Sequence, residues 1–231
     1  MTDSREIGKR AAARAAADDL VGGLRLGLGT GSTVRFLLER LAERMRSEGV
    51  AWTAVATSEA TAELAMRLGL AVVELDSVDR LDVAIDGADE VDPRLDLIKG
   101  GGGALTREKI VAAAANRFVV IVDDSKLVDR LGATFRLPIE VLRFGWRHTR
   151  SLIENLGLPS ALRVNASGTV TVTDNGNYLL DAELGPNSDL GSLERALDSI
   201  PGVVECGLFV GMAHEIIVGS AIGRIHRLLR D

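Results

Sequence analysis

The chain has 231 residues, a net charge of −6 and a pI near 5.2, and 46% of its residues are hydrophobic. This length predicts a main domain with a smaller second one. The acidic balance argues against a general nucleic-acid surface, which needs clustered lysine and arginine to neutralise phosphates. With a single cysteine, Cys206, and three scattered histidines, the chain offers no internal disulfide and no metal-site spacing. We therefore expect no nucleic-acid partner and no metal.

The first twenty residues, MTDSREIGKRAAARAAADDL, predict an ordinary amphipathic helix. They contain no continuous apolar segment, and their acidic residues are atypical of a transit peptide. No run of 18 apolar residues occurs anywhere in the chain. We therefore expect a cytoplasmic protein without a membrane partner.

The first part of the chain alternates between short apolar strands and helices. Strands are predicted in LRLGLG, VAWTAVA, AVVEL, LDVAI, LDLI and RFVVIV, and helices in TVRFLLERLAERMRSE, residues 60–68 and ALTREKIVAAAAN. Strands this apolar are typical of a parallel sheet that is covered on both faces. The pattern predicts an α/β domain with a Rossmann-like parallel sheet and helices on both faces.

Beyond this alternating region the pattern changes. RLPIEVL and VVECGLFV predict strands, and RHTRSLIENLG and residues 190–199 predict helices. VTVTDNGNYLLDAEL predicts two strands joined at residues 174–176, because Asp, Asn and Gly together are a hairpin signal. These segments predict a small antiparallel α+β second domain.

The domain bounds follow from this change. We predict that residues 131–206 form the second domain, and that residues 1–130 with 207–231 form the first. The last residues are expected to return to the first domain through the strand HEIIVGS and a terminal helix.

Three loops deserve inspection, because ligands of open parallel sheets bind outside the carboxyl ends of the strands. The first loop is GLGTGST, residues 27–33. Its glycines allow a tight turn, Ser32 and Thr33 offer hydroxyls, and the following helix presents unpaired N–H groups to a phosphate or carboxylate. It does not match the dinucleotide fingerprint G-x-G-x-x-G, because Ser32 stands at the sixth position. It does not match a P-loop either, because no lysine precedes Ser32. A plain turn with Ser32 as helix cap explains the loop equally well.

The second loop, IDGADEVD, contains two carboxylates at the end of an apolar strand. Asp86 and Asp89 flank a turn that Gly87 permits. Such a pair can transfer protons or bind sugar hydroxyls. A solvated acidic turn is the alternative, and a calcium loop ranks last because the order D-x-[DN]-x-[DN]-G is absent.

The third loop, LIKGGGGALTREKI, places four glycines between a strand that ends at Lys99 and a helix that carries Glu108 in about its first turn. The helix dipole alone would explain a carboxylate there. Four glycines need another reason, since each costs conformational entropy and one or two suffice for a turn. Close approach of the backbone to a ligand is the better interpretation.

Lysine is scarce in this chain. Only four of the 27 basic residues are lysines, at positions 9, 99, 109 and 126. Where arginine is used so freely, a retained lysine indicates that a compact ammonium is needed. Lys99 and Lys126 both lie at predicted ligand-side strand ends, which supports an anionic ligand.

The motifs GLGTGST, DGADEVD, KGGGGALTREK, DDSK, TDNGN and PGVVECGLF, in this order and spacing, closely resemble ribose-5-phosphate isomerase of the A type over nearly the whole chain. The resemblance implies an isomerase that interconverts D-ribose 5-phosphate and D-ribulose 5-phosphate through an enediolate, in the non-oxidative pentose phosphate pathway. It also implies that no metal or organic cofactor is used, and that the protein is a homodimer or homotetramer.

The resemblance also assigns site residues. It implies that Glu108 is the proton-accepting base. The implied substrate-contacting positions are Thr30, Gly31, Ser32, Thr33, Asp86, Gly87, Ala88, Asp89, Lys99, Gly100, Gly101, Gly102 and Lys126. The chemistry agrees, because moving a carbonyl between C1 and C2 needs a base, and the enediolate oxygen needs positive charge or donors, which Lys99 and the loop amides offer. Asp86 and Asp89 are then left for hydroxyl protons and ring opening.

Two other functions fit parts of the sequence. The same scaffold is similar to the sugar-phosphate-binding sensor domains of some transcription regulators, which bind without catalysis. Such a regulator needs an N-terminal DNA-reading domain, whereas here the first strand already begins near Leu24. The second alternative, a dinucleotide-dependent dehydrogenase, is disfavoured because the loop at residues 27–33 does not match the dinucleotide fingerprint.

Overall fold

The computed structural model describes residues 4–186 and 189–230. The described residues form two compact units. Unit 1 lies within residues 1–88, 107–127 and 212–231, and unit 2 within 89–106 and 128–211. The domain bounds drawn from the sequence stay a prediction; the units differ from them mainly because residues 89–106 group with the second unit.

Unit 1 is built on a seven-stranded sheet in the order β14-β13-β7-β4-β1-β2-β3. Its strands are β1 (Arg25–Leu28), β2 (Thr53–Ala56), β3 (Ala71–Val72), β4 (Val83–Asp86), β7 (Phe118–Asp123), β13 (Glu215–Gly219) and β14 (Ile225–Leu229). Every neighbouring pair is parallel except β13 and β14. The ends of β1, β4 and β7 therefore meet at one edge, where ligands of such sheets bind.

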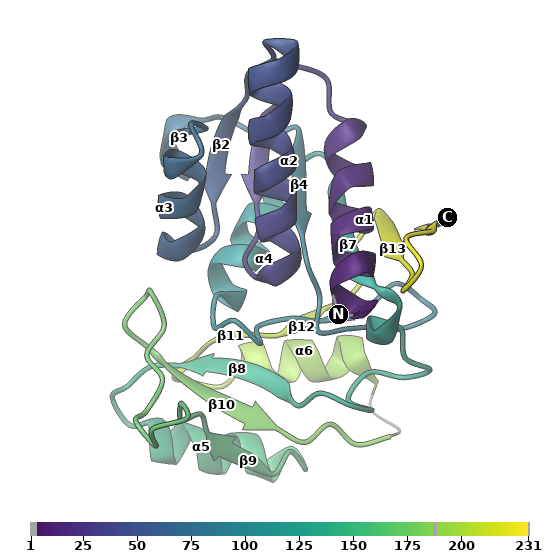
Figure 1. Cartoon of the computed structure of the whole chain (residues 1–231). Coiled ribbons are helices and arrows are strands. Elements are labelled where there is room, and N and C mark those ends of the chain that lie inside the picture. Colours follow the sequence, from purple (N-terminus) through teal and green to yellow (C-terminus); the bar gives the residue numbers. More distant parts are fainter. Residues whose placement is uncertain (1–3, 187–188, 231) are drawn as a thin grey trace. The chain divides into compact units, whose positions relative to one another are not determined.

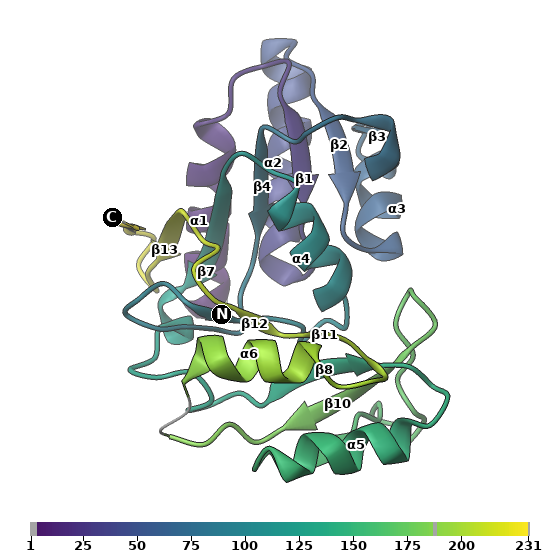
Figure 2. The ribbon, with the colours of Figure 1, turned by 180° about the vertical axis from the view of Figure 1, so that it is seen from behind.

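Helices cover both faces of this sheet. The helical elements are α1 (Ser4–Asp18), α2 (Ser32–Glu48), α3 (Glu59–Arg67), the short 3₁₀ turns η1 (Leu75–Ser77) and η2 (Asp124–Lys126), and α4 (Leu105–Ala113), of which residues 107–113 belong to unit 1. Figure 1 shows α1 and α2 on one face, and Figure 2 shows α4 on the other. Four alanines of α1 are buried, so its backbone packs close to the sheet. Among the helices described here, none has both the length and the apolar character to cross a bilayer.

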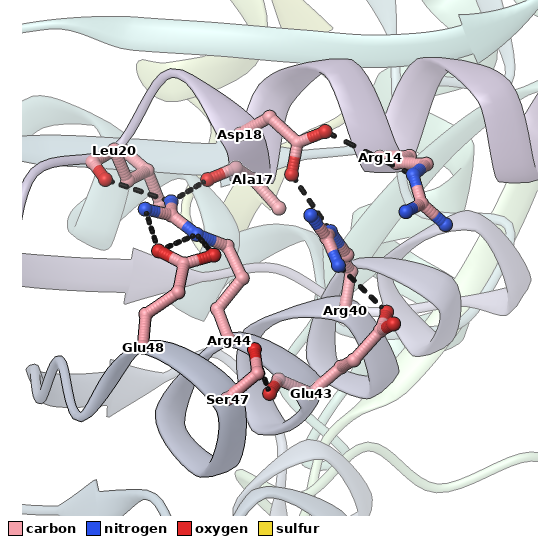
Figure 3. Close-up of polar contacts among 9 residues, drawn as sticks. All are labelled: Arg14, Ala17, Asp18, Leu20, Arg40, Glu43, Arg44, Ser47 and Glu48. Carbon is pink, nitrogen blue, oxygen red and sulfur yellow. Dashed lines mark hydrogen bonds and ion pairs between the residues drawn. The ribbon is translucent and has the colours of Figure 1, made fainter.

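A polar network joins the end of α1 to α2 (Figure 3). The buried Arg44 guanidinium donates to the carbonyl of Leu20 at 2.8 Å and to that of Ala17, and it pairs with Glu48 at 2.7 Å. The hydrogen bond with Glu48 raises the pKa of Arg44, and the same contact lowers the pKa of Glu48. Arg44 thus satisfies the Ala17 carbonyl in the last turn of α1, which has no intrahelical partner, and the Leu20 carbonyl just beyond the helix.

The prediction of a terminal helix is wrong, because residues 225–229 form the strand β14. The segment IHRLL is too short for a stable helix. A tight turn precedes it, in which Gly223 has a positive φ of 77° and donates to Ser220. The strand then pairs antiparallel with β13, with Ile225 opposite Gly219.

Unit 2 contains a four-stranded antiparallel sheet in the order β11-β8-β10-β9 and a three-stranded one in the order β12-β6-β5. The strands are β5 (Glu90–Val91), β6 (Leu97–Ile98), β8 (Leu137–Val141), β9 (Ser160–Leu162), β10 (Tyr178–Ala182), β11 (Val203–Cys206) and β12 (Leu208–Phe209). Helices α5 (Trp146–Asn155) and α6 (Leu190–Asp198) contribute Ile153 and Leu197 to a core under the four-stranded sheet. The predicted hairpin has its turn over residues 173–177, and its second strand is β10. Its first strand is not formed as a regular strand: across the turn, Val172 pairs with Tyr178 in an isolated β-bridge.

Two strand predictions need correction. The strand before Lys99, which is β6, does not join the parallel sheet. Only three residues separate β4 from β5, too few for a parallel crossover, so the chain leaves the sheet there. β6 then pairs antiparallel with β5. The predicted strand VVECGLFV is two strands in two sheets, separated by Gly207. A Cβ at Gly207 would overlap the carbonyl oxygen of Lys99, so only glycine fits where the chain changes sheets.

Candidate functional site

In unit 1, the loop that follows β1 contacts the carboxylate at the end of β4. We call residues 29–33 the helix-entry loop. Oδ1 of the buried Asp86 accepts hydrogen bonds from the backbone N–H of Thr30 at 3.0 Å and of Gly87 at 2.7 Å. A Cβ at Gly29 would overlap the Asp86 side chain, so this approach requires glycine. The structure thus brings Thr30, Asp86 and Gly87 together.

Hydroxyl groups from the next strand and helix hold the same loop. Thr30 Oγ1 donates to Ser58 Oγ at 2.9 Å and lies 2.8 Å from Thr57 Oγ1, while Thr61 Oγ1 donates to the Gly29 carbonyl at 2.9 Å. These three hydroxyl residues were not predicted. The signal for Thr57 and Ser58 was the polar end of the strand VAWTAVATS, and Ser58 also caps α3.

The start of α2 combines a helix N-terminus with exposed polar groups. Gly31 is the N-cap with a positive φ of 119°, and both Gly31 and Ser32 are exposed, while Thr33 is buried. Lys9 Nζ on α1 donates to Ser32 Oγ at 3.0 Å. A helix N-terminus, a hydroxyl and an ammonium together favour a phosphate or carboxylate. The sequence did not connect Lys9 with this loop, although the scarcity of lysine marked it.

A close backbone contact sets the position of Lys9. A Cβ at Gly8 would overlap the carbonyl oxygen of Gly219, and one at Gly219 would overlap that of Gly8. Gly219 ends β13 and pairs with Asp123 at the end of β7. Two glycines therefore let α1 rest on the carboxyl edge of the sheet, where Lys9 follows directly.

The other predicted residues of unit 1 lie at the same kind of position. Lys126 is half-buried and ends η2, directly after β7. Ala88 is half-buried and follows the Asp86–Gly87 turn. Glu108 lies in the first turn of α4 and is only 4% exposed. The dipole of α4 favours its negative charge.

In unit 2, the four glycines form a tight turn next to Asp89. We call residues 100–103 the glycine loop. The N–H of Gly103 donates to the carbonyl of Gly100 at 3.0 Å, and the N–H of Gly101 donates to Asp89 Oδ2 at 2.7 Å. Gly100 and Gly103 have positive φ values of 106° and 81°. Gly101 and Gly102 are exposed at the tip, so their backbone is accessible to a ligand.

Lys99 leads into the glycine loop from β6. Its side chain is 2% exposed, and its Nζ lies 5.5 Å from the centre of the Phe209 ring. Such a cation–π contact stabilises an ammonium away from water. The Lys99 N–H donates to the Gly207 carbonyl at 2.9 Å, which ties the lysine to the point where β11 passes into β12.

The motif TDNGN surrounds a buried carboxylate. Glu140 on β8 is fully buried, and its Oε1 accepts from Thr173 at 2.9 Å, Asn175 at 3.1 Å and Asn177 at 2.9 Å. Its Oε2 accepts from Thr106 Oγ1 at 2.6 Å. Four donors compensate a charge that burial alone would penalise. The motif therefore anchors Thr106, which lies in the first turn of α4.

The predicted site residues thus occur as two sets, each described within its own unit. Unit 1 carries Thr30, Gly31, Ser32, Thr33, Asp86, Gly87, Ala88, Glu108 and Lys126, and unit 2 carries Asp89, Lys99, Gly100, Gly101 and Gly102. Within the sets, hydrogen bonds join Thr30 to Asp86 and Asp89 to Gly101.

Comparison with known proteins decides the family. Residues 53–223 match the sequence profile of the family described as ribose 5-phosphate isomerase A (phosphoriboisomerase A). The chain belongs to this family. It is similar to ribose-5-phosphate isomerase A of Rhodopseudomonas palustris (strain TIE-1), with 52% identity over 96% of this chain and 97% of the relative.

Solved structures agree with this family. The chain is similar to ribose 5-phosphate isomerase A from Methanocaldococcus jannaschii, with a TM-score of 0.90 and 38% identity over 96% of this chain and 97% of that one. It is also similar to a D-ribose-5-phosphate isomerase in complex with phospho-erythronic acid, with a TM-score of 0.92, 38% identity and the same coverage. The predicted family, α/β fold class and isomerase activity are confirmed. The site residues, the cytoplasmic location and the oligomeric state stay predictions.

Proposed function

We propose that the protein interconverts D-ribose 5-phosphate and D-ribulose 5-phosphate with Glu108 as the base and Lys99 as the group that stabilises the enediolate. The observation that carries this assignment is the segment Lys99–Glu108. It places a buried lysine, exposed loop amides and a buried carboxylate within ten consecutive residues. The relative with bound phospho-erythronic acid supports a phosphorylated four- or five-carbon acid or sugar as ligand.

The proton transfer needs one carboxylate. Glu108 takes the proton from C2 of the open-chain aldose, which leaves an enediolate, and returns it to C1 to give the ketose. In the reverse direction the same carboxylate takes the proton from C1. A positioned acid–base group of this kind contributes roughly 10²- to 10⁴-fold in rate.

The negative charge that develops on the enediolate oxygens needs donors. The Lys99 ammonium and the N–H groups at the tip of the glycine loop are the groups assigned to it. Lys99 is held by burial and by Phe209, so little reorganisation is needed when the charge appears.

Asp86 and Asp89 handle the hydroxyl protons, including those moved when the sugar ring opens. Each aspartate is oriented by backbone amides: Asp86 by those of Thr30 and Gly87, and Asp89 by that of Gly101. A carboxylate with one oxygen fixed in this way presents its second oxygen in a defined direction, as proton transfer requires.

The phosphate is assigned to the start of α2. Ser32 and Thr33 supply hydroxyls and the first N–H groups of the helix, and Lys9 supplies the ammonium at 3.0 Å from Ser32. Lys126 is a further contact by family resemblance. A local site of this kind explains how a chain of net charge −6 binds an anion.

The wider setting follows from the resemblance. The protein is proposed to act in the cytoplasm, in the non-oxidative pentose phosphate pathway, as a homodimer or homotetramer and without a metal or organic cofactor. Sedimentation of the purified protein distinguishes the two oligomers. An assay in excess chelator tests the cofactor statement, which fails if a divalent metal is needed to restore activity.

The residue assignment is tested with Glu108→Gln, which keeps the shape of the side chain and removes its basicity. The variant should bind ribose 5-phosphate with near wild-type affinity in calorimetry, while kcat falls by roughly 10²- to 10⁴-fold. Turnover close to wild type would reject Glu108 as the base. Binding without turnover in the wild-type protein would instead favour the sensor function.

A further inference from the structure

The glycine loop rests on one particular face of the four-stranded sheet in unit 2. Leu137, Ile139 and Val141 of β8 point into the core with α5 and α6. The alternating residues, Pro138 and Glu140, face the other way. A Cβ at Gly100 would come within 3.1 Å of Pro138, and one at Gly103 within 3.5 Å of Leu179, the β10 residue opposite Glu140. The loop therefore packs on this second face.

Arg163 holds the loop from the same sheet. It directly follows β9, and its side chain is 14% exposed. Its Nη1 donates to the carbonyl oxygens of Gly100 at 2.8 Å and Gly101 at 3.3 Å. Its Nε and Nη2 donate to both carboxylate oxygens of Asp181 on β10, with Nε to Oδ2 at 2.9 Å. A bidentate pair of this kind fixes the plane of a guanidinium.

These contacts set the direction of the loop amides. In a trans peptide the N–H points away from the carbonyl of the same unit. The Gly100 carbonyl points to Arg163, and the N–H of Gly101 accordingly points to Asp89 on the other side. The Gly101 carbonyl also points to Arg163, so the N–H of Gly102 is turned away from Arg163 at the exposed tip.

We propose that Arg163, held by Asp181, is a positioning residue for the isomerisation: it orients the peptide units after Gly100 and Gly101 so that their N–H groups face Asp89 and the enediolate. The inference rests on the proposed function of the glycine loop. Without Arg163, the Gly100 carbonyl keeps the N–H of Gly103 as a donor, but both carbonyls lose the guanidinium. The peptides then rotate more easily, because glycine has no preferred sign of φ. The loop would then lose donors that must be in place before charge develops.

A cavity beside Arg163 provides a direct test. It has a volume of about 280 Å³ and is lined by Gly101, Thr134, Phe135, Arg136, Arg163 and Asp181. Because this space adjoins the guanidinium, a truncated Arg163→Ala variant leaves a site that free guanidinium can enter. Asp181 remains there to bind it, and guanidinium can donate to the same two carbonyls.

The experiment compares Arg163→Ala with wild type in a direct ribose 5-phosphate assay. We expect kcat to fall by about 10- to 100-fold, with KM changed less than threefold, because the affected donors act on the transition state. Millimolar guanidinium should restore much of the kcat of Arg163→Ala, and the restored kcat should level off as the guanidinium concentration rises. Sodium at equal ionic strength should not restore it. Affinity for phospho-erythronic acid, whose carboxylate resembles the charged enediolate, should fall more than affinity for the substrate.

The matched control is Arg136→Met. Arg136 lines the same cavity but forms an exposed ion pair with Glu183 at 2.9 Å, so kcat should not change. Wild-type kcat in Arg163→Ala, or a loss that guanidinium does not reverse, would overturn the proposal. An equal loss in Arg136→Met would also overturn it, since the effect would then come from the cavity in general.

Failure of the proposed function is distinguishable from failure of this inference. If the wild-type protein does not isomerise ribose 5-phosphate, the proposed function fails. Loop positioning is then still measurable by amide hydrogen exchange of residues 100–104. Exchange should be faster in Arg163→Ala and slow again on addition of guanidinium; exchange equal to wild type in Arg163→Ala would overturn the positioning role.

Discussion

The helix-entry loop and the glycine loop are both rich in glycine, yet they are held in different ways. The helix-entry loop is held by its own polar side chain: Thr30 Oγ1 contacts the hydroxyls of Thr57 and Ser58, and one glycine makes room for Asp86. The glycine loop has no side chains of its own. Apart from the turn hydrogen bond between Gly103 and Gly100, its backbone is held from outside, by Arg163 at the carbonyls and Asp89 at an amide.

The difference corresponds to the two tasks proposed for these loops. Gripping a phosphate needs a helix N-terminus, hydroxyls and an ammonium, all of which tolerate small displacements. Stabilising an enediolate needs donors at defined points, and backbone amides without side chains can approach a small substrate closely. We therefore expect substitutions near the glycine loop to change mainly kcat, and those at the helix-entry loop that leave Asp86 in place to change mainly KM.

Among substitutions that distinguish the two loops, the largest effect on activity is expected at Lys99. Lys99→Met and Lys99→Arg should both lower kcat by about 10²- to 10³-fold, the first by removing the charge and the second because a planar fork does not fit the space of a compact ammonium. Steady-state kinetics with ribose 5-phosphate measure this. Lys109→Arg serves as the control, and full activity of Lys99→Arg would show that any cation suffices there.

A smaller loss is expected at Gly29. In Gly29→Ala the new methyl group displaces Asp86, and a displacement of about 1 Å can cost roughly 10²-fold in rate. Gly31→Ala is the comparison, because its Cβ would meet open space although its φ is positive, and the strain should cost about 1 kcal/mol. Kinetics and thermal unfolding of both variants should show the larger loss of activity for Gly29→Ala. The reverse order would mean that loop conformation, rather than Asp86, is decisive.

At Lys9 we expect an effect on KM with little effect on kcat. Lys9→Met should raise KM about tenfold, equivalent to about 1.4 kcal/mol, with little change in kcat, because the phosphate does not react. Weaker competition by inorganic phosphate should accompany this change. If Lys9→Met lowers kcat while KM stays constant, the phosphate does not bind at the start of α2.

No loss of activity at saturating substrate is expected at Arg44, although stability should fall. Arg44→Met removes the guanidinium from the Leu20 carbonyl and leaves the Ala17 carbonyl with the N–H of Leu20 alone, which should cost about 2 to 4 kcal/mol in the free energy of unfolding. Arg40→Met removes pairs with the exposed Asp18 and Glu43 and should cost about 0.5 kcal/mol. Urea unfolding at pH 7 measures both, and equal costs would contradict the role of the buried carbonyls.

The same pair predicts a pH dependence. Arg44 lowers the pKa of Glu48 in the folded state, so the unfolded chain takes up the proton first as pH falls. The stabilisation is therefore complete above the ordinary glutamate pKa of about 4.3 and is lost as pH falls through the lower, folded value. The stability difference between wild type and Glu48→Gln should shrink between pH 6 and pH 3. A difference that is constant with pH would show that Glu48 contributes no charge.

Local features of the fold were predictable from the sequence. The predicted helix TVRFLLERLAERMRSE ends where α2 does, and Gly49 directly after it is the C-cap with a positive φ of 69°. The alternating strands and helices predicted the parallel sheet, because a strand followed by a crossover helix has few other arrangements. Glu108 was correctly placed in the first turn of α4.

Contacts between distant residues were not predictable in the same way. The sequence does not show that β12 pairs with β6, so the break at Gly207 and the place of Lys99 in an antiparallel sheet were missed. Lys9 and Arg163 each reach a loop far along the chain, and their roles depend on which elements the fold brings together. Only the scarcity of lysine pointed to Lys9, and we find no comparable signal for Arg163.

The contact between Gly8 and Gly219 has a consequence for the order of folding. A chain growing from its N-terminus completes α1 and the helix-entry loop early, but the surface that supports Lys9 is absent until β13 has been made. In the proposed phosphate site, substrate affinity is therefore expected to arise late in the nascent chain. A phosphorylated pentose would then stabilise the native state only after this last parallel strand is in place.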